Sequence, residues 1–125
     1  TVSGELVGHG ASVAGWSDNA WSVWGKTHRD SGAWLPLVVH LEDTAAVAEH
    51  LWDTWLPPIV RRRISAALGG EDALGRALLT WLGATHDVAK AAPAFAVKAR
   101  AVGMDHLLGA MARHGLTCGN VPRDE

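Results

Sequence analysis

The 125-residue sequence contains one cysteine, one phenylalanine and no tyrosine. With Cys118 alone, the chain cannot form an internal disulfide, so a reducing, cytoplasmic setting is expected. No apolar run approaches the roughly 18 residues that a membrane-spanning helix needs. Residues 1–16, TVSGELVGHGASVAGW, lack a basic segment followed by a solid apolar block. We therefore expect neither a signal peptide nor a membrane partner.

The sequence also lacks several features of other enzyme classes. Its formal net charge of −2 argues against a strongly basic nucleic-acid surface, although bound metal ions can supply local positive charge. A glycine-rich phosphate loop is absent, so any ATP-dependent step is expected to reside elsewhere. There is no Ser-His-Asp order with elbow glycines, and Cys118 has no evident activating partner. We therefore expect no nucleophilic side chain.

What is present is a helical pattern. Hydrophobic residues make up 48% of the chain and charged residues 19%, which is typical of one globular domain with a core. Apolar spacing predicts helices from near Pro36 to Trp55 and over 58–68, 73–91 (with Asp72 as a candidate N-cap), 93–102 and 104–114. No segment shows the alternation of polar and apolar residues that would predict a strand. Residues 1–35, rich in Gly, Ser and scattered Trp, are expected to form an irregular lead-in. The prediction is an all-α fold.

Four polar residues lie within or beside the apolar stretches of these helices. The run LLTWLGAT at 78–85 predicts a buried helix, and His86, Asp87 and Lys90 follow it; His40 lies beside the apolar face of the first predicted helix. A lone histidine in such a place is most simply a core residue bonded to a carbonyl. Burying Asp87 beside one, however, is costly without compensation. Imidazole and carboxylate suit a divalent transition metal, so His40, His86 and Asp87 together indicate a metal cluster.

Two sets of basic residues have open roles. Lys90 shares a face with His86 and Asp87 on the predicted helix, so it either pairs with Asp87 or lies beside a substrate phosphate. The run Arg61-Arg62-Arg63 could contact DNA, but such a run is more often a solvated helix face.

Three segments, taken in order, resemble a known family. The set of His40, then His86-Asp87 with Lys90, on an all-α chain resembles the HD phosphohydrolase superfamily. A closer match comes from WGK at 24–26, HLEDTAAVAEHLWD at 40–53 and HDVAKAAPAF at 86–95. These look like the HD-nuclease domain of the CRISPR-associated nuclease-helicase of type I systems. The resemblance implies an HD-domain helical bundle, with residues 1–35 as the lead-in carrying Trp-Gly-Lys and 36–125 as the front part of the nuclease domain.

The resemblance also implies an activity. Such domains are metal-dependent endo- or exonucleases that degrade single-stranded DNA in CRISPR antiviral defence. They are fused or bound to a helicase and recruited by a crRNA-guided surveillance complex. The cofactors implied are divalent iron, manganese, nickel, cobalt or zinc, with magnesium as an alternative, and two ions in the complete domain.

The resemblance also implies roles for individual residues. His40 matches the first metal ligand, His86 and Asp87 match the central pair, and Lys90 matches the lysine expected near the substrate phosphate. Asp43, one turn after His40, either orients that imidazole or is an ordinary surface carboxylate.

The sequence departs from the family pattern after the central pair. His106 and His114 do not fit the contexts of the family's later histidines, and its distal Asp has no match. We therefore expect a bundle that is incomplete at its C-terminal side, and a chain that alone binds at most one metal ion and cuts DNA poorly or not at all. Two other functions stay open: an HD phosphohydrolase acting on nucleotides, and a non-catalytic helical docking module.

Overall fold

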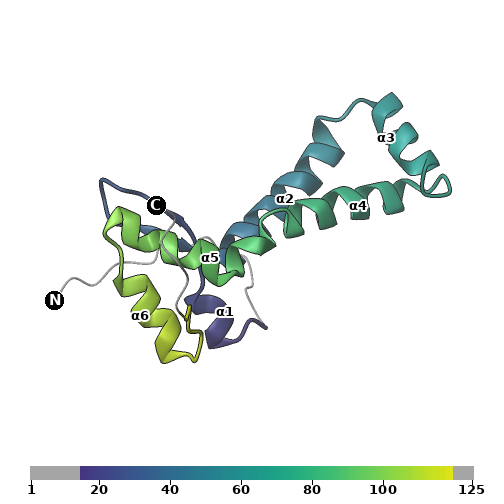
Figure 1. Ribbon diagram of the computed structural model, residues 1–125. Helices are drawn as coiled ribbons and strands as arrows, with labels where there is room; N and C mark the ends of the chain where they lie inside the picture. The colour runs from purple at the N-terminus through teal and green to yellow at the C-terminus, as the bar shows by residue number, and fades with distance from the viewer. Residues whose placement is uncertain (1–14, 120–125) are drawn as a thin grey trace. The chain divides into compact units, whose positions relative to one another are not determined.

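The computed structural model describes residues 15–119, and helices dominate them (Figure 1), which confirms the predicted all-α class. The chain divides into two compact units. The central unit is His40–Ala89, and the terminal unit is Thr1–Val39 with Lys90–Glu125. No helix among the described residues combines the length and the apolar character needed to cross a membrane.

The central unit is built from three helices. They are α2 (Leu37–Thr54, from His40 onward), α3 (Pro58–Ala66) and α4 (Asp72–Thr85). Pro57 and Pro58 separate α2 from α3, since proline interrupts a helix but suits its first turn. Gly69 and Gly70 separate α3 from α4 with φ values of 98° and 97°, a conformation that favours glycine. The breaks therefore fall where the sequence predicts them.

Trp52 is the centre of the core of this unit. Its buried ring lies so close to Gly75 that a Cβ there would overlap it. Its indole N–H donates to the Asp72 carboxylate at 3.3 Å. The predicted N-cap role of Asp72 is therefore wrong: Asp72 is the first residue of α4, Glu71 precedes it as the cap, and the Asp72 carboxylate bonds to Trp52 instead.

An ion-pair network also ties α4 to α2. The Arg76 guanidinium donates to Asp53 Oδ2 at 2.9 Å and to Glu49 Oε1 at 3.3 Å. The hydrogen bond from Arg76 lowers the pKa of Asp53 below its ordinary value of 3.8. These contacts lie along one side of the α2–α4 pair.

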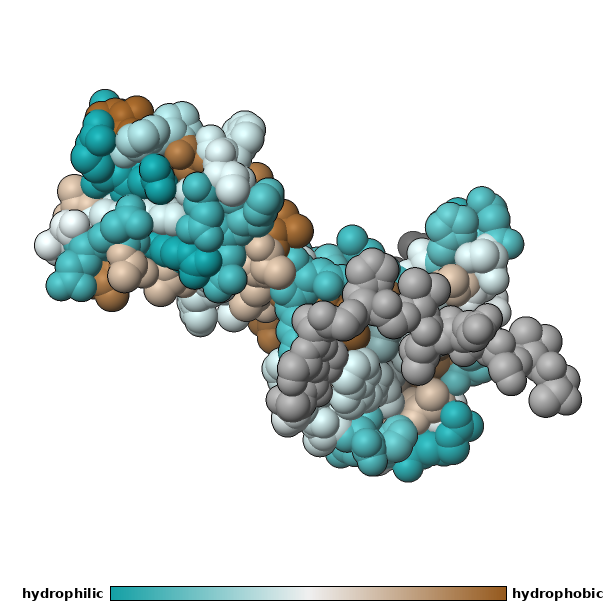
Figure 2. Space-filling model, turned by 180° about the vertical axis from the view of Figure 1, so that it is seen from behind, coloured by the Kyte–Doolittle hydropathy of each residue, from teal (hydrophilic) through white to brown (hydrophobic). Residues whose placement is uncertain are grey.

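Much of the apolar surface of the central unit is exposed. Trp81, in the run that predicts a buried helix, is 60% exposed, and Trp55 at the end of α2 is 72% exposed. Val47, Leu51 and Leu82 are exposed as well. Figure 2 shows hydrophobic residues reaching the surface. The expectation of burial is wrong here, because pairing α2 with α4 covers only one side of each helix.

The terminal unit begins with short regular elements in place of the expected irregular lead-in. Helix α1 (Asp18–Ser22) is capped by the Ser17 hydroxyl, which accepts from the amide of Ala20. Strands β1 (Trp24–Thr27) and β2 (Trp34–Pro36) pair antiparallel, with a shift in register between Trp24 and Lys26. The prediction of no strand is thus wrong, since strands of four and three residues are too short to show alternation. Residues 1–14 of the predicted lead-in lie outside the described residues.

The second half of the terminal unit is helical. It contains η1 (Val88–Ala91, from Lys90 onward), α5 (Pro93–Ala96), η2 (Val97–Val102) and α6 (His106–Arg113). The helix predicted over 93–102 is therefore an α-helical turn followed by a 3₁₀ helix, and Gly103 ends it with φ 71°. The core of the terminal unit includes the buried Ala99, Met104, Leu107 and Met111.

Trp24 joins two of the segments that carry the family resemblance. Its buried indole donates from Nε1 to the carbonyl of Ala96 at 3.1 Å, and its ring packs on Phe95 with centroids 4.6 Å apart. The Trp-Gly-Lys segment and the AAPAF segment therefore meet through one side chain. Trp24 pins the N-terminal part of the described chain onto the core, whereas Trp16 and Trp34 stay exposed.

Candidate metal centre

Three predicted ligands lie together in the central unit. His40, His86 and Asp87 each offer one ligand atom, and these atoms all lie within 4.8 Å of one another. His40 Nε2 is 2.8 Å from Asp87 Oδ2, and His86 Nε2 is 3.1 Å from the same oxygen. The imidazole rings meet edge to face, with centroids 5.4 Å apart. The structure therefore brings together the residues that the sequence proposes as ligands.

The three candidate ligands differ in the element that carries them and in their exposure to solvent. His40 is the fourth residue of α2 and is 7% exposed, so a regular helix holds its ring inside the unit. His86 caps the C-terminal end of α4, and Asp87 lies in the turn that follows. Their side chains are 42% and 28% exposed. The cluster is thus buried on the His40 side and open on the side of the doublet.

The sequence predicts that His86 and Asp87 lie inside a helix over 73–91, and this prediction is wrong. Helix α4 ends at Thr85, and the 3₁₀ helix η1 begins at Val88. His86 Nδ1 lies 2.8 Å from the carbonyl oxygen of Gly83. The imidazole thereby supplies a donor to one of the last carbonyls of α4, which lack partners within a helix. His86 and Asp87 therefore reach the cluster from the end of a helix, not from adjacent positions within a continuous helix.

Gly83 sets the approach of the helices beside the cluster. A Cβ on Gly83 would lie 3.0 Å from both the Cβ of Ala48 and the carbonyl oxygen of Thr44. Helix α4 thus runs against α2 within one turn of His40 and His86. Gly83 was not among the residues predicted to shape the site. The signal was present, because a glycine inside an apolar helix often marks a close backbone approach.

The hydrogen bond to Gly83 also decides the chemistry of His86. A carbonyl only accepts, so Nδ1 carries the proton and donates it. In neutral His86, Nε2 then presents a lone pair to Asp87 Oδ2, 3.1 Å away. Two lone pairs at that distance repel unless a proton or a metal ion lies between them. The geometry of the doublet therefore suits a bound cation.

The donor set fits one transition-metal ion. Zinc binds imidazole nitrogen and carboxylate oxygen at about 2.0–2.2 Å in a tetrahedron, which places neighbouring donor atoms about 3.3 Å apart. The two separations from Asp87 Oδ2, 2.8 Å and 3.1 Å, are slightly shorter than that spacing, and all three ligand atoms lie within 4.8 Å of one another. Among residues 15–119, no other group of three histidine, cysteine or acidic residues gathers in this way. Three protein ligands leave at least one position for water or substrate.

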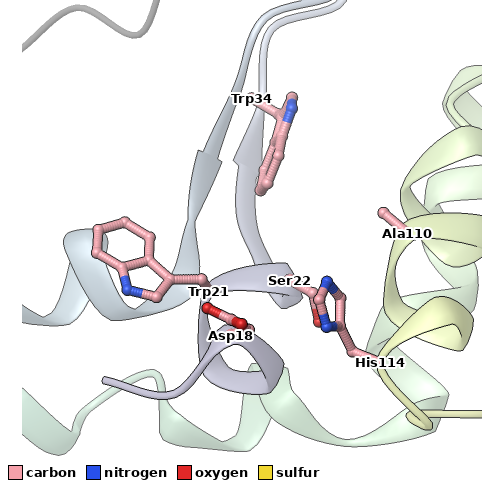
Figure 3. A pocket seen from close by; sticks show the side chains of 6 residues that line it. All are labelled: Asp18, Trp21, Ser22, Trp34, Ala110 and His114. Atoms are coloured by element: carbon pink, nitrogen blue, oxygen red, sulfur yellow. The ribbon is translucent and has the colours of Figure 1, made fainter. Parts of the chain in front are cut away.

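Other candidate residues lie outside this cluster. Asp43 is exposed on α2, and within the described part of the chain its carboxylate makes no hydrogen bond to His40. His106 begins α6 and His114 caps its C-terminal end, both in the terminal unit. His114 lines an open hollow of about 270 Å³ together with Asp18, Trp21, Ser22, Trp34 and Ala110 (Figure 3).

Lys90 belongs to the terminal unit. It lies on η1 and not on a continuation of α4, so the argument that a helical face groups it with His86 and Asp87 is wrong. Its ammonium group is 5.5 Å from the centre of the Phe95 ring. In the arginine run on α3, Arg61 is half-buried while Arg62 and Arg63 are exposed.

Comparison with known proteins identifies the family. Residues 24–123 match the family described as "Cas3, HD domain". The chain belongs to the Cas3 HD-domain family. The "CRISPR-associated nuclease/helicase Cas3" of Streptococcus thermophilus is 42% identical over 66 residues, which cover 50% of this chain and 7% of that relative. No solved structure matches the chain.

Membership of the Cas3 HD family confirms the resemblance derived from the three sequence segments. It makes the chain a CRISPR-associated domain of a nuclease family, and HD domains are metal-dependent hydrolases. The chain spans only 7% of the length of the Streptococcus thermophilus relative.

Proposed function

We propose that this chain is a metal-dependent nuclease domain that degrades single-stranded DNA in CRISPR antiviral defence in the cytoplasm. The observation that carries the proposal is the convergence of His40, His86 and Asp87 in a Cas3 HD domain. A divalent ion held there would supply a Lewis acid for the phosphodiester and would lower the pKa of water.

The protein side chains have distinct tasks in this proposal. His40 Nε2, His86 Nε2 and one Asp87 oxygen hold the ion. The Nδ1–H of His86 donates to Gly83, which fixes the ring orientation and makes Nε2 the ligand atom. The exposed outer side of His86 and Asp87 leaves access for a DNA backbone. Lys90, three residues after Asp87 in the sequence, serves as a cation for the substrate phosphate.

The relative supports the substrate and the partners. The name of that Streptococcus thermophilus protein joins a nuclease to a helicase, and a helicase produces single strands. We therefore propose single-stranded DNA as the substrate, a helicase domain as a partner, and a crRNA-guided surveillance complex as the means of recruitment.

A cleavage assay tests the proposal and separates it from the alternatives. The chain, with and without a helicase partner, is supplied in turn with manganese, iron, nickel, cobalt, zinc or magnesium. It is then given labelled single-stranded DNA, mononucleotides and cyclic nucleotides. We expect cleavage of the DNA that a chelator abolishes and added metal restores. Hydrolysis of nucleotides alone would instead support a nucleotide phosphohydrolase, and a protein without metal or activity would support a docking module.

Three alanine variants test the ligands. His86→Ala and Asp87→Ala should remove most of the bound metal and the DNA cleavage. His40→Ala should lower metal affinity while helix content, measured by circular dichroism, stays near wild type. His50→Ala is the matched control, because His50 is an exposed histidine on α2 outside the cluster. If metal content and cleavage persist in all three ligand variants, the assignment is wrong.

A further inference from the structure

An open hollow in the terminal unit combines aromatic rings with one acidic side chain. Its volume is about 270 Å³, and the residues that border it include Asp18 and Trp21 of α1, Trp34 of β2 and His114 at the end of α6. In Figure 3 the Trp34 ring lies on one side of this space, and the Asp18, Ser22 and His114 side chains lie on the other. Pockets for drug-sized ligands have volumes of about 300–1,000 Å³, so this hollow suits a group the size of one side chain.

The polar atoms of the hollow are mainly hydrogen-bond acceptors. The Ser22 hydroxyl already donates its proton to the carbonyl of Asn19 at 2.7 Å, so the lone pairs of its oxygen are left for another partner. An ionised carboxylate only accepts hydrogen bonds, whereas the imidazole of His114 can donate or accept. Within residues 15–119 the Asp18 side chain makes no hydrogen bond or ion pair. The hollow therefore suits a positively charged group with several N–H donors.

The aromatic rings of the hollow attract the same kind of group. Tryptophan binds a cation over its ring face more strongly than phenylalanine or tyrosine does. Trp34 is 36% exposed, so solvent and ligands reach its ring. In the described part of the chain, the cation–π contacts are those of two lysines with Phe95, and none involves Trp21 or Trp34. A cation in the hollow would therefore meet an unoccupied indole ring and an unpaired carboxylate.

Arginine fits this combination better than the alternatives. Its guanidinium group is flat and always charged, has five N–H donors and no acceptor, stacks on aromatic rings and pairs with carboxylates. The ammonium group of lysine carries the charge but has no plane to stack. A nucleobase has acceptors as well as donors on its edges, and the phosphates of its strand would be repelled by Asp18. Arginine is also one of the residues that most often anchor protein–protein interfaces.

We propose that the hollow bordered by Asp18 and Trp34 binds an arginine side chain of a partner protein. The guanidinium plane stacks on the Trp34 ring, and its N–H groups donate to the Asp18 carboxylate. The residues that border the hollow belong to the terminal unit, and none of them is a candidate metal ligand. The proposal therefore goes beyond the nuclease function proposed above and does not depend on it.

The test is a nuclear magnetic resonance titration of the chain with short blocked peptides. The indole N–H signals of the seven tryptophans are followed, and Trp21→Phe and Trp34→Phe identify the signals of the hollow. The probes are acetyl-Gly-Arg-Gly-amide, the same peptide with lysine, and the same peptide with citrulline, which is flat but uncharged. We expect the arginine peptide to shift the Trp34 signal at the lowest concentration, the lysine peptide to bind more weakly, and the citrulline peptide to have little effect.

Two controls separate the site from general stacking on exposed rings. Trp55 is 72% exposed but lies in the central unit, so its signal should not move. Asp18→Asn keeps the shape of the side chain and removes its charge, which should weaken binding of the arginine peptide by about three- to tenfold. Asp30→Asn is the matched variant, because Asp30 is an exposed acidic residue between β1 and β2 outside the hollow, and it should bind like wild type.

Three results would overturn the proposal. The arginine peptide could shift Trp55 as much as Trp34, or it could bind Asp18→Asn as tightly as wild type. A single-stranded oligonucleotide could also shift the Trp34 signal where the arginine peptide does not, which would make the hollow a nucleobase site instead. Because Asp18→Asn retains His40, His86 and Asp87, its metal content and DNA cleavage should match wild type whichever result is obtained.

Discussion

Asp87 is the residue on which the centre depends, because one of its oxygens faces the Nε2 atoms of both histidines. Without a cation or protons between them, these three atoms would hold lone pairs toward one another. Removing the carboxylate would leave two imidazoles with no shared partner. A single carboxylate oxygen thus couples a buried histidine on α2 to an exposed one at the end of α4.

Lys90→Ala tests the other residue that the sequence proposes for the reaction. An ammonium group cannot ligate a metal while protonated, so bound metal should stay at the wild-type level. Loss of one preorganised charge near the phosphate should slow cleavage by about 10²–10³-fold. Metal content and single-turnover cleavage are the measurements, with Lys26→Ala as a control for an exposed lysine of the same unit. Full activity of Lys90→Ala would leave Lys90 with a structural role.

The sequence was enough to predict which three residues form the ligand cluster. It was not enough to predict how they are arranged. An acidic residue beside a histidine after an apolar run, with His40 on another predicted helix, is enough to suggest a cluster. The proton on His86 Nδ1 depends on a hydrogen bond to Gly83, and the contact of Lys90 with Phe95 depends on the fold around α5. Neither contact has a signature in composition or spacing.

At the scale of elements, the close packing of α4 on α2 holds the ligands together. Gly83→Ala should widen this contact, because its Cβ would lie 3.0 Å from Ala48 and from the Thr44 carbonyl. Overpacking of this kind costs about 1–3 kcal/mol, against a gain of up to about 1 kcal/mol in helix propensity. We expect a lower melting temperature together with weaker metal binding.

Gly109→Ala is the control for that variant. Gly109 is also helical, in α6, but a Cβ there would meet nothing within 4 Å. This change should therefore be neutral or stabilising and should leave metal affinity unchanged. If Gly83→Ala behaves like Gly109→Ala in melting and in metal titration, the helix contact does not set the ligand spacing.

The Asp53–Arg76 pair gives the same helices a dependence on pH. The hydrogen bond from Arg76 lowers the pKa of Asp53 in the folded state, so this pair stabilises the fold above the ordinary pKa of 3.8. That contribution is lost as the pH falls through the lowered folded value. Asp53→Asn should thus lower the melting temperature slightly at pH 7, and its difference from wild type should disappear in strong acid.

Melting curves of both proteins between pH 7 and about pH 2 provide the measurement. Asp43→Asn is the control, since Asp43 is exposed on the same helix and takes no part in the Arg76 pairs. A difference between Asp53→Asn and wild type that persisted unchanged into acid would show that the ion pair is not its source.

Element boundaries were predictable where proline or glycine sets them and not elsewhere. The breaks at Pro57-Pro58, at Gly69-Gly70 and at Gly103 all follow from local chemistry. The end of α4 at Thr85 coincides with the His86 ring donating to the Gly83 carbonyl, which apolar periodicity does not register. The β1–β2 pair is too short for alternation to indicate it.

At the scale of the whole molecule, the number of ligands limits the number of metal ions. Within residues 15–119 one cluster of three ligands is present, and two ions in contact would require more donors than it offers. We expect this chain to bind at most one transition-metal ion and to cut single-stranded DNA slowly. Metal content per chain, measured by mass spectrometry after dialysis, is the test. Two tightly bound ions with fast cleavage would show that further ligands exist.

The two units differ in how their residues are distributed along the chain. The central unit is one continuous segment, His40–Ala89, whereas the bond from Trp24 to Ala96 in the terminal unit joins residues 72 apart. During synthesis, α2, α3 and α4 can therefore assemble as soon as they leave the ribosome, while Trp24 has to wait for Phe95 and Ala96 to be made. Because His40, His86 and Asp87 all belong to the continuous segment, the proposed metal site can form in a nascent chain before the terminal unit has folded.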